Sequence, residues 1–96
     1  KFTESFVSSD MTISSTNIKV ELFGFPTRIT KVQGITEDAK AFDILAAPIS
    51  RNAETQFDTF TISGNEITIS TRLRKYNEIF VVYNINSTYD PHYKTA

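Results

Sequence analysis

The sequence contains no cysteine, no tryptophan, one histidine and three isolated glycines. Without cysteine the chain forms no disulfide, thiolate nucleophile or zinc–thiolate site. The single histidine, His92, excludes a metal cage built from several imidazoles. Three scattered glycines exclude a glycine-rich phosphate loop. We therefore predict that the chain binds no metal ion and no cofactor.

An excess of charge of one sign is also missing, since ten Lys and Arg residues face eleven Asp and Glu residues. This balance argues against a strongly basic nucleic-acid binder and against a polybasic membrane module. No apolar run approaches the roughly 20 residues that a membrane span needs. We expect residues 1–96 to form a single domain that neither binds nucleic acid nor inserts into a membrane.

The chain is rich in β-branched and aromatic residues. Isoleucine occurs eleven times against three leucines, beside eight Phe and four Tyr. Such side chains fit a pleated, half-buried sheet better than a helix. Ser and Thr add 22 residues, as expected where each sheet has one wet face. These features predict an all-β fold, a single antiparallel β-sandwich of about six to seven strands.

The first strand pattern lies at the N-terminus. Phe2–Val7 alternates weakly, and within residues 1–10 we expect an edge strand or a strand exchanged with another copy. Phe2, Phe6 and Val7 are the candidate residues for such an assembly strand.

A second pattern, Ile18–Leu22, alternates apolar with charged residues and predicts a half-buried strand. Beyond it, Phe23 and Phe25 are expected to turn toward the second face, and Ile29–Gln33 forms a short strand. Four phenylalanines are candidates either for core packing, which we favour, or for a carbohydrate-stacking platform: Phe2, Phe6, Phe23 and Phe25.

The strongest local signal is the Gly-Asn pair at 64–65, which separates two alternating runs. It predicts a two-residue hairpin of type II′ with positive φ at the glycine. Such a loop pairs Ile62 with Ile67 and Phe60 with Ile69. Each apolar residue then meets an apolar partner, and a slip by one residue would destroy this match.

Two longer segments complete the pattern. Glu78–Ile85 is apolar on both faces, which predicts a central strand of the sandwich. The stretch 36–47 has two readings, a helix capped by Thr36 or a strand at 42–44 beside a loop. We favour the strand because the surroundings are β. Pro48–Gln56 reads as a polar loop.

Candidate chemistry is sparse. Arg72, Arg74 and Lys75 form the only basic cluster. On a strand, the two arginines would project from one face and contact an anion or a glycan, although a solvated charged face explains them as well. Glu37 and Asp38 are the only adjacent carboxylates, and we expect a solvated loop rather than a catalytic dyad. The residues therefore predict no catalytic site.

Residues 86–96 read as a polar C-terminal tail. His92 lies in it, and we expect it to be exposed because a tail offers no positioned partner for a general base. Asn86 opens the only N-x-Ser/Thr triplet and is a candidate N-glycosylation site if the protein is secreted. Four tyrosines are further candidates for a carbohydrate platform: Tyr76, Tyr83, Tyr89 and Tyr93.

The chain begins at Lys1 and has its only methionine at Met11. Because a primary translation product begins with Met, we expect a processed or excised product.

Five segments resemble, in order, the distal C-terminal β-sandwich domain of the α-glucosidases related to lysosomal acid α-glucosidase and sucrase-isomaltase. Ile18–Pro26 is similar to their strand that ends in Gly and a Pro-containing turn, and Ile29–Gly34 to the short strand that follows. Phe60–Ile69 resembles their aromatic-led hairpin, Glu78–Tyr83 their last strand, and Phe2–Ile13 the strand pair that leads in. The insertion at 46–57 and the tail after Ile85 depart from the family pattern.

The resemblance implies a non-catalytic accessory module, because the nucleophile and the acid of that family lie in a separate barrel. It implies an extracellular or lumenal location, and a partner that is the catalytic barrel of a parent protein, with carbohydrate as a further ligand. The alternative function is an extracellular structural subunit that binds copies of itself, as a filament or a strand-exchanged polymer.

Overall fold

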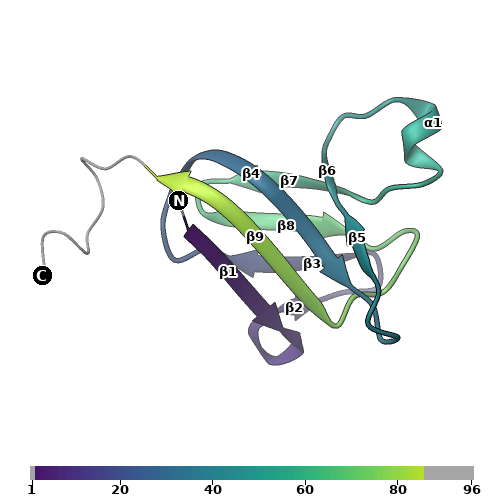
Figure 1. Ribbon diagram of the computed structural model, residues 1–96, viewed down its shortest axis with the longest axis horizontal. Coiled ribbons are helices and arrows are strands. Elements are labelled where there is room, and N and C mark those ends of the chain that lie inside the picture. Colours follow the sequence, from purple (N-terminus) through teal and green to yellow (C-terminus); the bar gives the residue numbers. More distant parts are fainter. Residues whose placement is uncertain (1, 86–96) are drawn as a thin grey trace, which may run out of the picture.

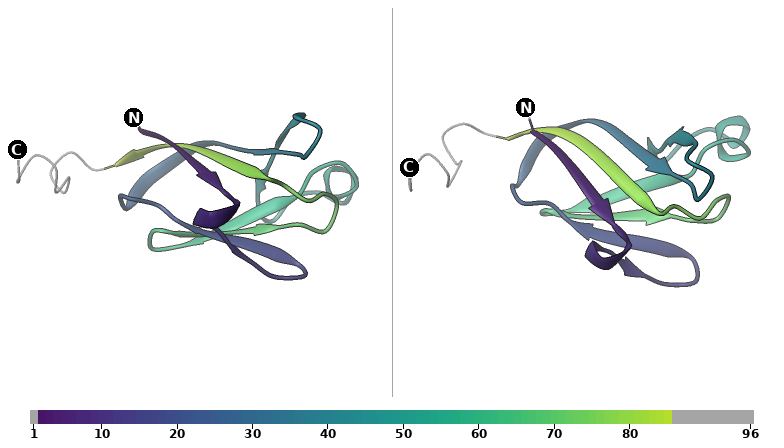
Figure 2. Two further views of the ribbon diagram at one scale, coloured as in Figure 1. Left: turned by 90° about the horizontal axis from the view of Figure 1, so that it is seen from below. Right: turned by 60° about the horizontal axis from the view of Figure 1, so that its bottom comes forward.

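The computed structural model describes residues 2–85, which form two β-sheets packed face to face (Figure 1). The strands are β1 (Phe2–Val7), β2 (Thr12–Ile13), β3 (Asn17–Glu21), β4 (Pro26–Ile35), β5 (Ala41–Asp43), β6 (Leu45–Ala46), β7 (Thr59–Ser63), β8 (Glu66–Ser70) and β9 (Glu78–Ile85). One sheet has the strand order β1-β9-β4-β5 and the other β2-β3-β8-β7-β6. The two layers are seen edge-on in Figure 2. This arrangement confirms the predicted all-β sandwich.

The core lies between the sheets and is filled by alternate residues of the central strands. In β9, Ile79, Val81 and Tyr83 are buried, while Phe80 and Val82 on the outer face are half-buried. β9 lies between β1 and β4, which confirms it as a central strand. The opposite sheet supplies the facing layer from β3 and β8: Ile18, Val20, Ile67 and Ile69.

The β7–β8 hairpin has the predicted register, with Ile62 opposite Ile67 and Phe60 opposite Ile69. Gly64 has a φ of 63°. Among residues 2–85, the one non-glycine residue with positive φ is Ala39. A hairpin with positive φ at its first central residue alone is of type II′, as the sequence predicts.

The corner between β3 and β4 differs from the expectation. Phe23 and Phe25 are 59% and 48% exposed, so the prediction that they pack in the core is wrong. β3 already ends at Glu21, and although Leu22 after it is still buried, the strand alternation does not continue through Phe23 and Phe25. Of the other two phenylalanines, Phe6 is buried in the core and Phe2 is half-buried.

β4 is longer than the predicted Ile29–Gln33, because it begins at Pro26. The first position of a strand is where a missing N–H is best tolerated. Its register with β9 shifts twice, which leaves Thr27 and Thr30 as extra residues. Both shifts are β-bulges, which bend and twist a strand and which composition does not reveal.

The stretch 36–47 contains strands β5 and β6 and no helix, so the favoured reading is confirmed. β6 pairs with β7 in parallel, the one exception to antiparallel pairing within residues 2–85. A short helix, α1 (Arg51–Glu54), lies in the predicted loop, where the Ser50 hydroxyl accepts a hydrogen bond from the Ala53 N–H. The two-residue strands β2 and β6 raise the strand count of residues 2–85 above the predicted six to seven.

Candidate functional site

The basic cluster lies in the β8–β9 loop and not on a strand, so that part of the prediction is wrong. The guanidinium of Arg72 donates to the carbonyl of Glu54, and that of Arg74 donates to the carbonyl of Gln56 at 3.0 Å. Arg74 also stacks on the ring of Phe42, 3.9 Å from its centroid. Through these hydrogen bonds both arginines hold the segment around α1 against the β8–β9 loop. The stacking of Arg74 on Phe42 contributes a further stabilisation of roughly 0.5–2 kcal/mol.

Lys75 is exposed in the same loop. It lines two surface clefts, one beside Thr36 and Asp38 and one beside Ile13 and Tyr76. An anion or glycan contact at this lysine stays a prediction.

Asp58 is the buried carboxylate of residues 2–85, with 1% of its surface exposed. Its two oxygens accept hydrogen bonds from the Leu73 N–H at 3.0 Å and from the Tyr76 hydroxyl at 2.7 Å. Burial, and then the carboxylate of Asp58, raise the pKa of Tyr76 above its usual value. The ring of Tyr76 lies directly on Gly34. This stack ties the β8–β9 loop to β4 and gives Asp58 a structural role.

Glu4 is the second carboxylate with a tyrosine partner. It accepts hydrogen bonds from the Tyr83 hydroxyl and, at 2.9 Å, from the Phe23 N–H. The oxygen of Tyr83 in turn accepts from the Gly24 N–H at 3.1 Å. Burial, and then the hydrogen bond to Glu4, raise the pKa of Tyr83 to about 12. This network fastens β1 and the β3–β4 corner to β9.

Several residues that the sequence predicts as binding sites lie inside the fold, in the sheet or in the core. The candidate assembly strand Phe2–Val7 lies in the sheet of its own chain, paired with β9 along its whole length. Within it Phe6 is buried, Phe2 packs against Tyr83 with ring centroids 5.9 Å apart, and Val7 is exposed. Because Tyr76 and Tyr83 are buried, the prediction that they stack on carbohydrate is wrong.

The remaining sequence-based candidates form no site that can be described. Asp38 is exposed, accepts a hydrogen bond from the Thr36 hydroxyl and lies 3.8 Å from the Lys40 amine, while Glu37 is also exposed. Asn86, His92, Tyr89 and Tyr93 lie outside the described residues, as does the predicted tail 86–96. Glycosylation at Asn86 stays a prediction.

The feature that sequence reasoning missed is an opening in one flank of the sandwich. β5 pairs with β4 only from Gln33 to Ile35. β6 pairs with β7 only at Thr59 and Phe60. On this flank no strand of residues 2–85 therefore pairs with the first half of β4 or with the second half of β7, and the interior opens between the two sheets.

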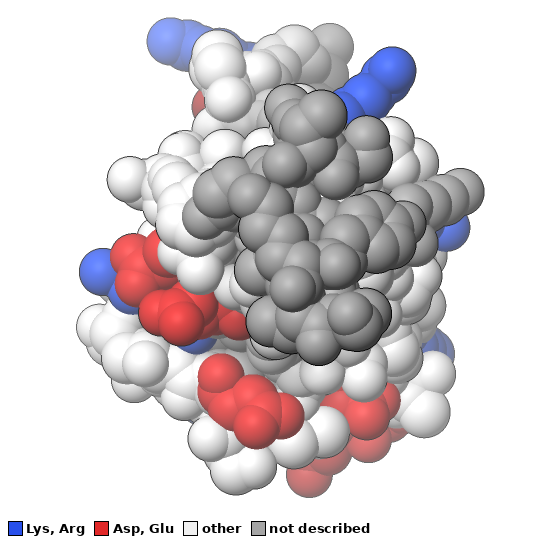
Figure 3. All heavy atoms as spheres, turned by 90° about the vertical axis from the view of Figure 1, so that its left-hand side faces the viewer, with Lys and Arg blue, Asp and Glu red and all other residues white. Residues whose placement is uncertain are grey.

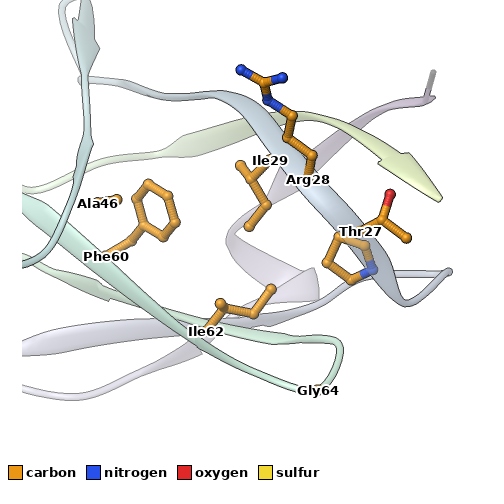
Figure 4. A pocket seen from close by; sticks show the side chains of 8 residues that line it. Thr27, Arg28, Ile29, Ala46, Phe60, Ile62 and Gly64 are labelled. Atoms are coloured by element: carbon orange, nitrogen blue, oxygen red, sulfur yellow. The ribbon is translucent and has the colours of Figure 1, made fainter. Parts of the chain in front are cut away.

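This open cleft has a volume of about 330 Å³. It is lined by Pro26, Thr27, Arg28, Ile29, Ala46, Phe60, Ile62 and Gly64. Figure 4 shows Ile29, Phe60 and Ile62 directed into the cleft, whereas the guanidinium of Arg28 points away from it. Ile62 is 41% exposed, although its hairpin partner Ile67 is fully buried. The cleft therefore exposes inward-facing apolar side chains of both sheets.

The end of the sandwich at which β9 finishes carries negative charge. Figure 3 views this end and shows acidic side chains on its left and lower parts. Glu21 and Glu66 face each other here across the β3–β8 ladder, close to the β7–β8 turn and so to Gly64 of the open cleft. Two like charges opposite one another destabilise a sheet.

Comparisons with protein-family models, with curated proteins and with solved structures found no match for this chain. No set of three or more acidic, histidine or cysteine side chains within residues 2–85 is placed to hold a metal ion. The same part of the chain has no helix with the length and apolar character of a membrane span.

Proposed function

We propose that this chain is a non-catalytic β-sandwich interaction module that binds a partner protein through the open cleft. The observation that carries the proposal is the pair of inward-facing isoleucines, Ile29 and Ile62, in an opening that no strand within the described residues covers. When a partner covers water-exposed apolar surface of this kind, the burial favours binding by about 25 cal/mol per Å².

The shape and chemistry of the cleft favour a protein side chain over a small molecule. Its volume of about 330 Å³ lies at the lower end of the roughly 300–1,000 Å³ that small-molecule sites occupy. The side chains that point into it are apolar, and a small ligand would lack polar groups to orient it. An apolar anchor of a partner needs no such groups, and Arg28 at the rim adds a residue type that is common in interfaces.

The resemblance of the sequence to the distal domain of α-glucosidases supports the choice of partner. We infer that the partner is the catalytic barrel of an α-glucosidase-like protein in the secretory pathway. A non-catalytic role also fits the two carboxylates with tyrosine partners, since Glu4 and Asp58 both accept hydrogen bonds from a hydroxyl and a backbone N–H. These carboxylate oxygens thus take part in hydrogen bonds that stabilise the fold.

The alternative, a strand-exchanged polymer, has less support. Exchange requires that Phe2–Val7 leave its sheet, and this segment pairs with β9 over six positions and buries Phe6. Its departure would also break the bonds of Glu4 to Tyr83 and to Phe23.

Calorimetric titration tests the proposal. The chain is titrated into an α-glucosidase of this family from which the distal domain has been deleted, with Ile62→Lys as the test variant and Ile13→Lys as the matched control. Ile13 is 57% exposed but lies on β2, away from the open cleft. A buried isoleucine anchor contributes about 1.5–3 kcal/mol, so Ile62→Lys should weaken binding by about 10- to 100-fold.

The control variant should bind as the wild type does, and both variants should keep the wild-type melting temperature because both positions are exposed. Equal weakening by the two variants, or no binding by the wild type, would contradict the proposal. Hydrolysis of an α-glucoside by the purified chain alone would contradict the non-catalytic role.

A further inference from the structure

The opposite flank of the molecule ends in a strand edge that nothing in the described residues covers. β1 is the outermost strand of its sheet, and it pairs on one side only. The pairing with β9 runs over six consecutive positions with no register shift. In such a strand every second residue directs its N–H and C=O to the free side, where they can pair with another strand.

The other long edge carries the features that prevent pairing. The uncovered half of β4 contains Pro26, the two bulges at Thr27 and Thr30, and the exposed cations Arg28 and Lys31. Proline, bulges and charge each protect an edge against strand addition. The remaining outer strands, β2, β5 and β6, are two or three residues long.

β1 has none of these features. Its outward-facing residues are Thr3, Ser5 and Val7, which are exposed and uncharged. Its one charged residue, Glu4, is turned inward and bound to Tyr83 and Phe23. From Phe2 to Phe6, β1 is thus a regular and uncharged edge that the described residues leave accessible.

We propose that β1 pairs with β1 of a second copy, antiparallel about a two-fold axis, and joins the two four-stranded sheets into one. Two registers pair most of the strand with its copy, and the favourable one is centred on Ser5, so that Ser5 lies opposite Ser5 and Thr3 opposite Val7 of the partner. Placing Glu4 at the centre would set two carboxylates against each other. A slip by one residue would set inward residues opposite outward ones, which the pleat forbids.

The Val7 N–H is already bound to the Asp10 carboxylate at 3.2 Å. The capping turn therefore closes the edge at Val7, and the ladder between copies is short. Pairing at this edge leaves the open cleft on the other flank free, so the two surfaces act independently. The expected dimer is accordingly a weak one that forms as the concentration rises.

Disulfide trapping tests the proposed register, because the chain has no cysteine of its own. Ser5→Cys places two thiols directly opposite, with Cα atoms about 4.5–5.5 Å apart, which a disulfide can span. Thr3→Cys is the matched control, since four residues of strand separate its two copies by about 13 Å. Under mild oxidation Ser5→Cys should form a dimer at least tenfold faster than Thr3→Cys, as seen by intact mass.

Sedimentation at rising concentration tests the edge without a covalent bond. Ser5→Lys faces outward and leaves the fold intact, but it sets two ammonium groups opposite each other. It should weaken the wild-type dimer at least tenfold, whereas Thr61→Lys, an exposed change on β7, should not. A wild type that stays monomeric, or a Ser5→Cys rate equal to that of Thr3→Cys, overturns the proposal, even if the strand of an unrelated protein is found on this edge.

Discussion

Replacement of Gly34 by alanine is the most informative test of how the sandwich is held together. A Cβ at this position would lie 2.3 Å from Cδ1 of Tyr76 and 2.6 Å from both Cγ and Cε1. No pair of non-bonded carbon atoms tolerates such distances, so the ring has to move. Tyr76 is 3% exposed and its hydroxyl binds the buried carboxylate of Asp58 at 2.7 Å. The ring therefore cannot retreat without losing this bond.

Two terms set the magnitude. Overpacking of a filled core costs about 1–3 kcal/mol, and loss of a hydrogen bond to a buried carboxylate costs about 1.5–3 kcal/mol. Together they predict a loss of at least about 2.5 kcal/mol for Gly34→Ala. For a domain of this size each kcal/mol lowers the melting temperature by roughly 4–8 °C. The variant should melt at least about 10 °C below the wild type.

The assay is thermal and urea unfolding followed by far-UV circular dichroism, with Gly24→Ala as the control. A Cβ at Gly24 meets the Cγ2 methyl group of Ile85 at 3.1 Å, a smaller overlap than at Gly34, and Ile85 is only half-buried at the end of β9. This control should cost less than about 1 kcal/mol. If Gly34→Ala melts within about 2 °C of the wild type, the ring does not rest on the glycine and the reasoning fails.

Three further outcomes follow from single residues. Ala39 has a φ of 65°, a conformation that costs a non-glycine residue about 1–2 kcal/mol, so Ala39→Gly should raise the free energy of unfolding in urea; a loss would show that the strain is absent. Glu66→Lys turns the like-charged pair with Glu21 into an ion pair and should stabilise by about 0.2–1 kcal/mol at low salt, a gain that should vanish in 1 M NaCl. The raised pKa of Tyr83, about 12, means that the fold favours its protonated form; the stabilisation is present below the unfolded pKa of about 10 and is lost as the pH rises through about 12. Between these two pH values the melting temperature should decrease less steeply with rising pH for Tyr83→Phe than for the wild type. Equal slopes of melting temperature against pH would exclude this linkage.

The elements that the sequence predicts well are those with local causes. The 64–65 turn and its two alternating runs determine the hairpin register, because turn chemistry and apolar matching act over neighbouring residues. The central position of Glu78–Ile85 follows from its apolar faces.

The elements that escape prediction depend on contacts between distant segments. Tyr83 and Glu4 are 79 positions apart, and Tyr76 and Asp58 are 18 apart, so no local pattern marks either pair. The sequence identifies the four side chains only as tyrosines and carboxylates. Their burial depends on the tertiary fold.

The open cleft is the least predictable feature. It exists because β5 and β6 cover only parts of β4 and β7, and the lengths of two- and three-residue strands lie below what periodicity resolves. One signal was present in the sequence. Ser50 is a residue type that favours the N-cap of a helix, and it indicates that the chain enters α1 soon after β6. The basic cluster likewise reads as a surface patch until the carbonyls that Arg72 and Arg74 bind are known.

The most direct test of the account is a map of backbone amide signals by nuclear magnetic resonance while the distal-domain-deleted enzyme is added to the labelled chain. The signals that should shift or broaden first are those of four residues that line the open cleft: Thr27, Arg28, Ile62 and Gly64. Signals that stay unchanged there, or changes confined to Thr71 and its neighbours at the surface cleft beside Ile13 and Tyr76, would contradict a module that binds its partner through the opening between β4 and β7.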